Sequence, residues 1–389
     1  MNEHSREFRQ LNLLHILNDG YQASIALVLP FVAVELGLAL AQVGALSSFQ
    51  SAVGILMVMP AGWLAKRYGG AKTLVVAMVM CSLVFVGLSQ APMYAMLALL
   101  FGLAGMSLGV FHPIAFALVS DWSTKTNRGR MMSDFAAWGD VGRIGLSTAL
   151  PMLAVAIGWR FATLWYGVVG VTIALVLSWL LLKSGSATVK SKAAGQESLR
   201  DEVSHPRTFV AMVASFFDVM ASNSMYLFLP FLLVFRGIEL QTLGFFTAVF
   251  FIGNLLGKVV LGRLVDKRGS AKVFVISEII MVALILVLAI STNIASILGA
   301  ALILGIFAKG TTPIVQTMLA ESAEHHGDYV KVFSVNTIIT RVVAVAVPVA
   351  FGALADQFDI RWAFYAMAVA AACAVVPGVA FMATKQRVS

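Results

Sequence analysis

Long apolar runs separated by short polar breaks recur along the whole chain. Each run is close to the ~20 residues that an α-helix needs to cross ~30 Å of hydrocarbon. Helices are expected because hydrocarbon offers no hydrogen-bond partner to an open strand edge. The pattern therefore predicts an all-α membrane protein with twelve transmembrane helices, at residues 11–34, 40–64, 72–90, 93–119, 131–152, 161–182, 208–234, 241–262, 272–290, 293–319, 332–355 and 362–382.

Composition supports a bilayer as the solvent. The 389 residues are 60% hydrophobic and 12% charged, with a mean hydropathy of +0.90, whereas a soluble domain carries about 25% charged residues. The first run is too long and too polar for a signal peptide, and no small-residue cleavage site follows it. Cys81 and Cys373 fall within predicted helices, so no disulfide framework is expected.

The positive charges predict the orientation in the membrane. With the N-terminus inside, the inner segments hold 20 of the 27 lysines and arginines, and the outer loops hold only Arg160, Arg236 and Arg361. The positive-inside rule then places both termini in the cytoplasm, most simply across a bacterial inner membrane. The net charge of +8 is accordingly a topology signal and does not indicate nucleic-acid binding.

An internal repeat divides the chain into two halves. "LVLPFVAVELGLALAQVG" at 27–44 matches "LFLPFLLVFRGIELQTLG" at 227–244, and "GWLAKRYGGAK" at 62–72 matches "GRLVDKRGSAK" at 262–272, both at an offset of 200 residues. A repeat of six helices is typical of two-bundle transporters with a substrate site between the bundles. We therefore expect bundles at 1–182 and 208–389, joined by a polar cytoplasmic linker at 183–207.

The repeated loop carries a motif. Its second copy fits the pattern G-x-L-a-D-r-x-G-r-k, by which the chain resembles the major facilitator superfamily over essentially its full length. In that family the acid of the motif caps a helix of the other bundle and helps to latch one conformation. The first copy departs from it, because Lys66 stands where the acid is expected. The resemblance thus assigns latch residues at Gly262, Asp266, Lys267 and Gly269, with Lys66 as the departing position.

Two shorter motifs give a closer resemblance. "HILND" at 15–19, followed by Gln22 and Pro30, and "VFHP" at 110–113 are similar to the fosmidomycin-resistance branch of drug and metabolite exporters. This resemblance implies efflux. The antiporter signature of the fifth helix is echoed by Gly139, Gly142, Gly145 and Pro151.

Charged side chains lie deep inside six of the predicted helices. At 1.5 Å per residue, Asp19 and His112 are ~12 Å from the inner face and the others ~13 Å or more. Each charge costs at least ~2.5 kcal/mol at the bilayer centre, so these groups should face a cavity or one another. Within the first helix, His15, Asp19 and Gln22 share a face, and Asn18 and Gln22 form a second i, i+4 pair. The remaining members of this layer are Asp140, Arg143, Asp218, Lys309 and Arg341.

The acid and imidazole groups of this layer suggest proton coupling. Asp19, His112 and His15 are candidates, because a desolvated carboxylate and a nearby imidazole titrate close to neutral pH. A static hydrogen-bonded pair between two helices is the alternative. Asp140 and Arg143 form either a structural ion pair or one that substrate binding breaks.

The cations suggest an anionic substrate. Lys309 and Arg341 would bind its charge, with Asn18, Gln22 and Asp218 as further substrate-binding candidates. In the alternative, Asp218 and Asp140 neutralise the two cations when the cavity closes. Glu278 is expected to support its bundle.

No motif indicates an enzyme or a resident cofactor. A phosphate-binding loop is not evident, so ATP is not the expected energy source. "ESAEHHGD" at 321–328 could hold a metal but reads better as a solvated acidic loop, and no metal is predicted.

The sequence therefore predicts a monomeric, proton-coupled secondary transporter that exports a small, anionic metabolite or drug across the inner membrane. The alternative is an importer that uses the same residues as a symporter. A membrane sensor built on a transporter scaffold would have no need of so many buried charges.

Overall fold

The computed structural model describes residues 5–123, 128–183, 206–323 and 329–386, which excludes His325 and His326. The described residues form helices and no strand. Twelve spans are long and apolar enough to cross a membrane, which confirms the predicted fold class. The helices are α1 (Ser5–Leu36), α2 (Leu40–Tyr68), α3 (Gly70–Ser89), α4 (Tyr94–Trp122), α5 (Arg128–Ile157), α6 (Trp159–Lys183), α7 (Pro206–Ser222), α8 (Met225–Phe235), α9 (Leu243–Arg268), α10 (Ser270–Ile290), α11 (Ile294–Ala323), α12 (Tyr329–Gln357) and α13 (Ile360–Gln386), with a 3-10 turn at Leu240–Thr242.

The helices differ from the predicted runs in two ways. Several extend beyond their apolar run; α1, for instance, begins at Ser5 rather than at residue 11. Hydropathy marks the stretch that suits hydrocarbon, whereas backbone hydrogen bonding continues into polar residues. The predicted helix at 208–234 is broken into α7 and α8 at Asn223 and Ser224, two residues whose short polar side chains compete with helical hydrogen bonding.

The chain folds as two compact units. The first unit contains residues 1–38, 46–194 and 238–248, and the second contains residues 39–45, 195–237 and 249–389. Within the second unit, the backbone N–H groups of Leu40 and Ala41 donate hydrogen bonds of 2.7 Å each to the Asp356 carboxylate. This carboxylate caps the positive N-terminal end of α2.

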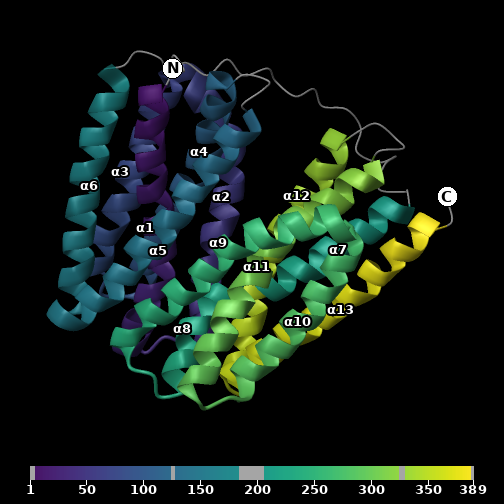
Figure 1. Cartoon of the computed structure of the whole chain (residues 1–389). Coiled ribbons are helices and arrows are strands. Elements are labelled where there is room, and N and C mark those ends of the chain that lie inside the picture. The colour runs from purple at the N-terminus through teal and green to yellow at the C-terminus, as the bar shows by residue number, and fades with distance from the viewer. Residues whose placement is uncertain (1–4, 124–127, 184–205, 324–328, 387–389) are drawn as a thin grey trace. The chain divides into compact units, whose positions relative to one another are not determined.

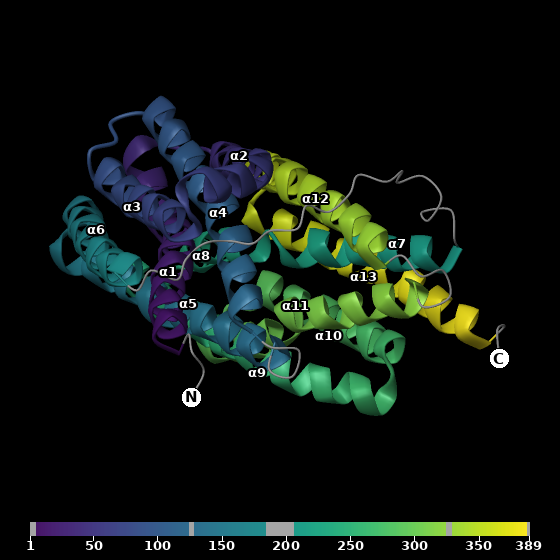
Figure 2. The ribbon, with the colours of Figure 1, turned by 90° about the horizontal axis from the view of Figure 1, so that it is seen from above.

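In the first unit, α1 packs along α5, and α3 packs against both α4 and α6 (Figures 1 and 2). Glycine permits the close approach of α1 and α5. A Cβ atom on Gly142 of α5 would lie 2.0 Å from the Ile16 carbonyl oxygen, and one on Gly20 of α1 would lie 2.7 Å from the Gly142 oxygen. Small residues let membrane helices pack backbone to backbone. Side chains that α1 and α5 direct toward each other are therefore held close together.

In the second unit, α10 packs against α11 and α13, and α13 also packs along α7 (Figure 1). The internal repeat extends to its helix contacts. A Cβ atom on Gly105 would lie 2.2 Å from the Gln50 oxygen, and one on Gly305 would lie 2.1 Å from the Phe250 oxygen. Gly305 and Phe250 lie 200 residues after Gly105 and Gln50, which is the offset of the sequence repeat. The same glycine contact therefore occurs once in each unit.

We predict that Gly142→Ala lowers stability by about 1–3 kcal/mol, because the new methyl group must push the α1 backbone away. The thermal unfolding midpoint of the purified protein in detergent measures this. Gly145→Ala is the matched control, since a Cβ there meets nothing within 4 Å. Its midpoint should stay the same or rise slightly. An equal loss in both variants would contradict close backbone packing at Gly142.

Candidate functional site

Asp19 lies at the centre of a polar cluster inside the first unit and is only 2% exposed. Three helices contribute to the cluster. His15 of α1 places its Nε2 atom 3.2 Å from Asp19 Oδ2, and His112 of α4 places its Nε2 atom 3.1 Å from Asp19 Oδ1. Arg143 of α5 contacts Asp19 Oδ2 at 2.5 Å. The structure thus joins the imidazole, carboxylate and guanidinium groups that the sequence placed at similar depths.

Arg143 bridges two carboxylates. Its Nη2 atom pairs with Asp19, and its Nη1 atom lies 2.5 Å from Oδ1 of Asp140, which is also 2% exposed. The i, i+3 pair of Asp140 and Arg143 expected from the sequence is present. Its extension to Asp19 was not expected, because it depends on how α5 is rotated against α1.

The hydrogen bonds of His15 limit where a proton can reside. Its Nδ1 atom lies 2.8 Å from the backbone oxygen of Phe135. A carbonyl can only accept, so Nδ1 carries a hydrogen. In a neutral ring, Nε2 would then present a lone pair to the Asp19 carboxylate at 3.2 Å. An additional proton between these two atoms turns this repulsion into a charge-assisted hydrogen bond.

The charges of the cluster lead to the same conclusion. Asp19 and Asp140 carry two negative charges, and Arg143 supplies one positive charge. A buried charge is costly unless it is paired. A proton on an imidazole beside Asp19 would offset one of the two negative charges. His112 is the more accessible of the two imidazoles, with a side chain 26% exposed against 3% for His15.

The sequence did not predict the roles of Phe135 and Gly139 in this site. Phe135 supplies the carbonyl acceptor for His15 and stacks on its ring at 3.9 Å between centroids. No sequence signal could have identified a backbone carbonyl as a partner. Gly139 provides the space, since a Cβ there would lie 2.6 Å from both Asp19 Oδ2 and His15 Cε1. In the sequence, Gly139 was noted only as one of the glycines that resemble the antiporter signature of the fifth helix.

The side chains of Asn18 and Gln22 form hydrogen bonds with different partners. Asn18 is fully buried and donates to Asp19 Oδ1 at 2.9 Å. Gln22 donates to the Ala104 carbonyl at 3.2 Å and accepts from Gln50 Nε2 at 2.8 Å. Gln50 lies in α2 beside Ser47, Ser48 and Ser51, and this polar stretch inside a predicted membrane span is a signal that sequence reading could have used.

The second unit holds a separate buried cluster. Asp218 of α7 is 3% exposed and lies against Thr311 of α11 and Glu278 of α10, both fully buried. Lys309 of α11 is half-buried, and its charge acts on Asp218. Arg341 is an exposed residue of α12.

The predicted latch loops share a backbone conformation. Gly69 and Gly269 have φ angles of +91° and +81° at corresponding places before α3 and α10. Only glycine adopts such angles readily. Lys66 and Lys267 are exposed and Gly262 is half-buried, while the side chain of Asp266 lies outside the part that the structure describes.

The cluster also contains groups that bind metals. One ligand atom each from His15, Asp19 and His112 lie within 4.8 Å of one another. Imidazole and carboxylate groups suit a transition metal. The Arg143 guanidinium, 2.5 Å from Asp19, already supplies a cation at this carboxylate and would repel a metal ion. The donor set therefore fits a proton better.

Known transporters are similar to this chain. It is 26% identical to a probable L-galactonate transporter of Escherichia coli over 66% of its length and 61% of that protein's. It is 25% identical to the multi-drug resistance efflux pump PmrA of Streptococcus pneumoniae over 90% of both chains. An uncharacterized transporter of Bacillus subtilis, YfnC, is 24% identical over 46% of this chain and 45% of YfnC. The chain thus spans about half to two thirds of two of these relatives.

Solved structures share the fold. A bacterial homologue of the human lysosomal transporter Spinster superposes with a TM-score of 0.77 at 16% identity, over 97% of this chain and 98% of that one. The nucleoside transporter NupG, as its D323A mutant, gives a TM-score of 0.79 at 14% identity, over 97% and 99%. The Major Facilitator Superfamily matches residues 11–242 and again residues 211–389. The chain therefore belongs to the major facilitator superfamily and is a multi-pass membrane transporter rather than an enzyme.

Proposed function

We propose that this transporter is proton-coupled and exports a small organic anion across a bacterial inner membrane, with both termini in the cytoplasm. One observation carries the proposal: the imidazoles of His15 and His112 lie 3.2 and 3.1 Å from the buried Asp19 carboxylate, where either ring is placed to hold a proton. The match to an efflux pump over 90% of both chains supports export, as does the resemblance to fosmidomycin-resistance exporters.

Proton binding would act through Arg143. While the cluster lacks the proton, the guanidinium is shared between Asp19 and Asp140. A proton on His112 or His15 partly satisfies Asp19 and weakens its hold on Arg143. The guanidinium can then shift toward Asp140. The bridge is in this way a switchable ion pair, and the more exposed His112 is the entry point for the proton.

The substrate is proposed to be an anion. Lys309 and Arg341 would bind its charge, and Asp218 would balance Lys309 when the substrate is absent. Asn18 and Gln22 would contribute polar contacts. The name of the E. coli relative supports this class, since galactonate is a carboxylate. Proton-coupled import of an organic anion is the second candidate.

Mass spectrometry of small molecules in cells and medium tests the direction and names candidate substrates. Cells expressing the wild type are compared with cells expressing Asp19→Asn at equal protein levels. Anions enriched in the medium only with the wild type would support export. Enrichment inside the cells would replace export by import.

Asp19→Asn is predicted to abolish flux driven by a pH gradient in proteoliposomes, because a neutral amide no longer supplies the negative charge that holds a proton on His15 or His112. Counterflow exchange, which requires no net proton movement, should remain largely intact. Glu239→Gln, at an exposed acid, is the control and should alter neither. Equal loss of both activities in Asp19→Asn would assign Asp19 a structural role.

Lys309→Gln is predicted to weaken binding of anions about tenfold or more while neutral analogues bind as before, since a charge-assisted contact is worth roughly 1.5–3 kcal/mol. Isothermal titration with the candidate substrates measures this. Lys272→Gln, at an exposed cation of α10, is the control. An unchanged preference for anions in Lys309→Gln would remove Lys309 from the substrate site.

A further inference from the structure

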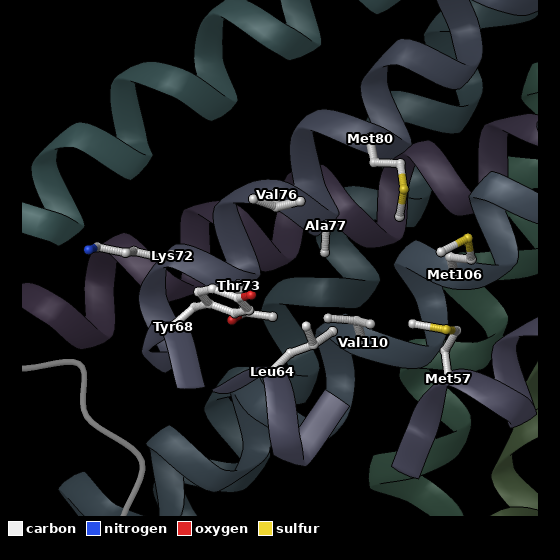
Figure 3. A pocket seen from close by; sticks show the side chains of 10 residues that line it. All are labelled: Met57, Leu64, Tyr68, Lys72, Thr73, Val76, Ala77, Met80, Met106 and Val110. Carbon is white, nitrogen blue, oxygen red and sulfur yellow. The ribbon is translucent and has the colours of Figure 1, made fainter. Parts of the chain in front are cut away.

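A cavity of about 460 Å³ lies between α2, α3 and α4 of the first unit, apart from the Asp19 cluster (Figure 3). Its two ends differ in chemistry. Met57, Met80 and Met106 gather at one end, whereas Tyr68, Thr73 and Lys72 lie toward the other. The Lys72 amine extends away from the methionines, as Figure 3 shows. An apolar groove with a cation at one end matches an amphiphile with an anionic head and an apolar tail.

The cationic end lies at the membrane surface. Lys72 is in the first turn of α3, directly after the turn at Gly69 that separates two membrane spans. Lys66 and Arg67 are exposed in the last turn of α2, so three cations fall within seven residues. Basic groups close to the membrane surface attract anionic lipid headgroups.

The internal repeat shows what is particular to this loop. Its counterpart 200 residues later carries Asp266 where the first copy has Lys66. An acid at this place would repel a phosphate, and the first copy has replaced it by a base. Lys66 therefore departs from the family's latch motif in the direction that anion binding requires.

The opposite end suits an acyl chain. Methionine is unbranched and polarizable, so it adapts to flexible apolar ligands. Val76, on the edge of the groove, is 64% exposed, which leaves the groove open to the bilayer from the side.

We propose that this groove binds an anionic phospholipid from the leaflet next to the α2–α3 turn. The phosphate would bind Lys72, with Lys66 and Arg67 adding positive charge. One acyl chain would lie along Met57, Met80 and Met106. The site requires only that the protein resides in a membrane, so it is independent of the transported substrate and of proton coupling.

Native mass spectrometry of the delipidated full-length protein tests the headgroup contact. Phosphatidylglycerol and phosphatidylcholine with identical acyl chains are the probes. The wild type should retain phosphatidylglycerol in preference, and Lys72→Gln should reduce that retention about fivefold, which corresponds to ~1 kcal/mol. Lys272→Gln, the equivalent position in the second copy, should leave it unchanged. Equal retention of both lipids by the wild type, or equal losses in both variants, would overturn the proposal.

Val76→Trp tests the groove itself. The indole would fill the groove from its open edge, and the exposed position should tolerate the larger side chain. Retention of phosphatidylglycerol should fall at least fivefold. Ile276→Trp is the matched control, because Ile276 is the repeat equivalent and is 42% exposed. Unchanged retention in Val76→Trp would show that the acyl chain lies elsewhere and would overturn the proposed site.

Discussion

A carboxylate in the interior of a membrane-spanning unit must be paired, and Asp19 is paired with Arg143 at 2.5 Å. The rest of the first unit's polar interior is arranged around this contact. Arg143 also pairs with Asp140 through its other amino group. The imidazoles of His15 and His112 contact the Asp19 carboxylate. The side-chain amide of Asn18 donates a hydrogen bond to the same carboxylate. Removing Arg143 would leave the two buried carboxylates of Asp19 and Asp140 without this counter-charge.

This ion pair in turn depends on glycine. Gly142 brings α5 against the backbone of α1, and Gly139 leaves the space that His15 and Asp19 occupy. With larger residues at these two positions, α1 and α5 would separate and Arg143 could no longer reach Asp19. The helix packing and the chemistry of the site thus rest on the same stretch of α5, which explains why small and charged residues alternate there.

Much of the fold and part of the site follow from local periodicity. The twelve spans are visible in hydropathy alone, and the spacings of His15 with Asp19 and of Asp140 with Arg143 place each pair on one helix face. The depth of His112 placed it near Asp19. The Arg143 contact with Asp19 was not predictable, because it depends on the rotation of one helix against another. The break between α7 and α8 was also missed, because the run from Pro206 to Phe235 as a whole is apolar enough to form a single span.

We propose that the Asp19 cluster holds one proton on the imidazole of His15 or His112. Solid-state NMR of the protein with ¹⁵N-labelled histidine in lipid bilayers measures the protonation state of the imidazole rings, because nitrogen chemical shifts distinguish a neutral ring from an imidazolium. We expect an imidazolium signal at neutral pH that disappears in Asp19→Asn, where its counter-charge is lost. Neutral rings for both His15 and His112 in the wild type, assigned through single His→Gln variants, would contradict it.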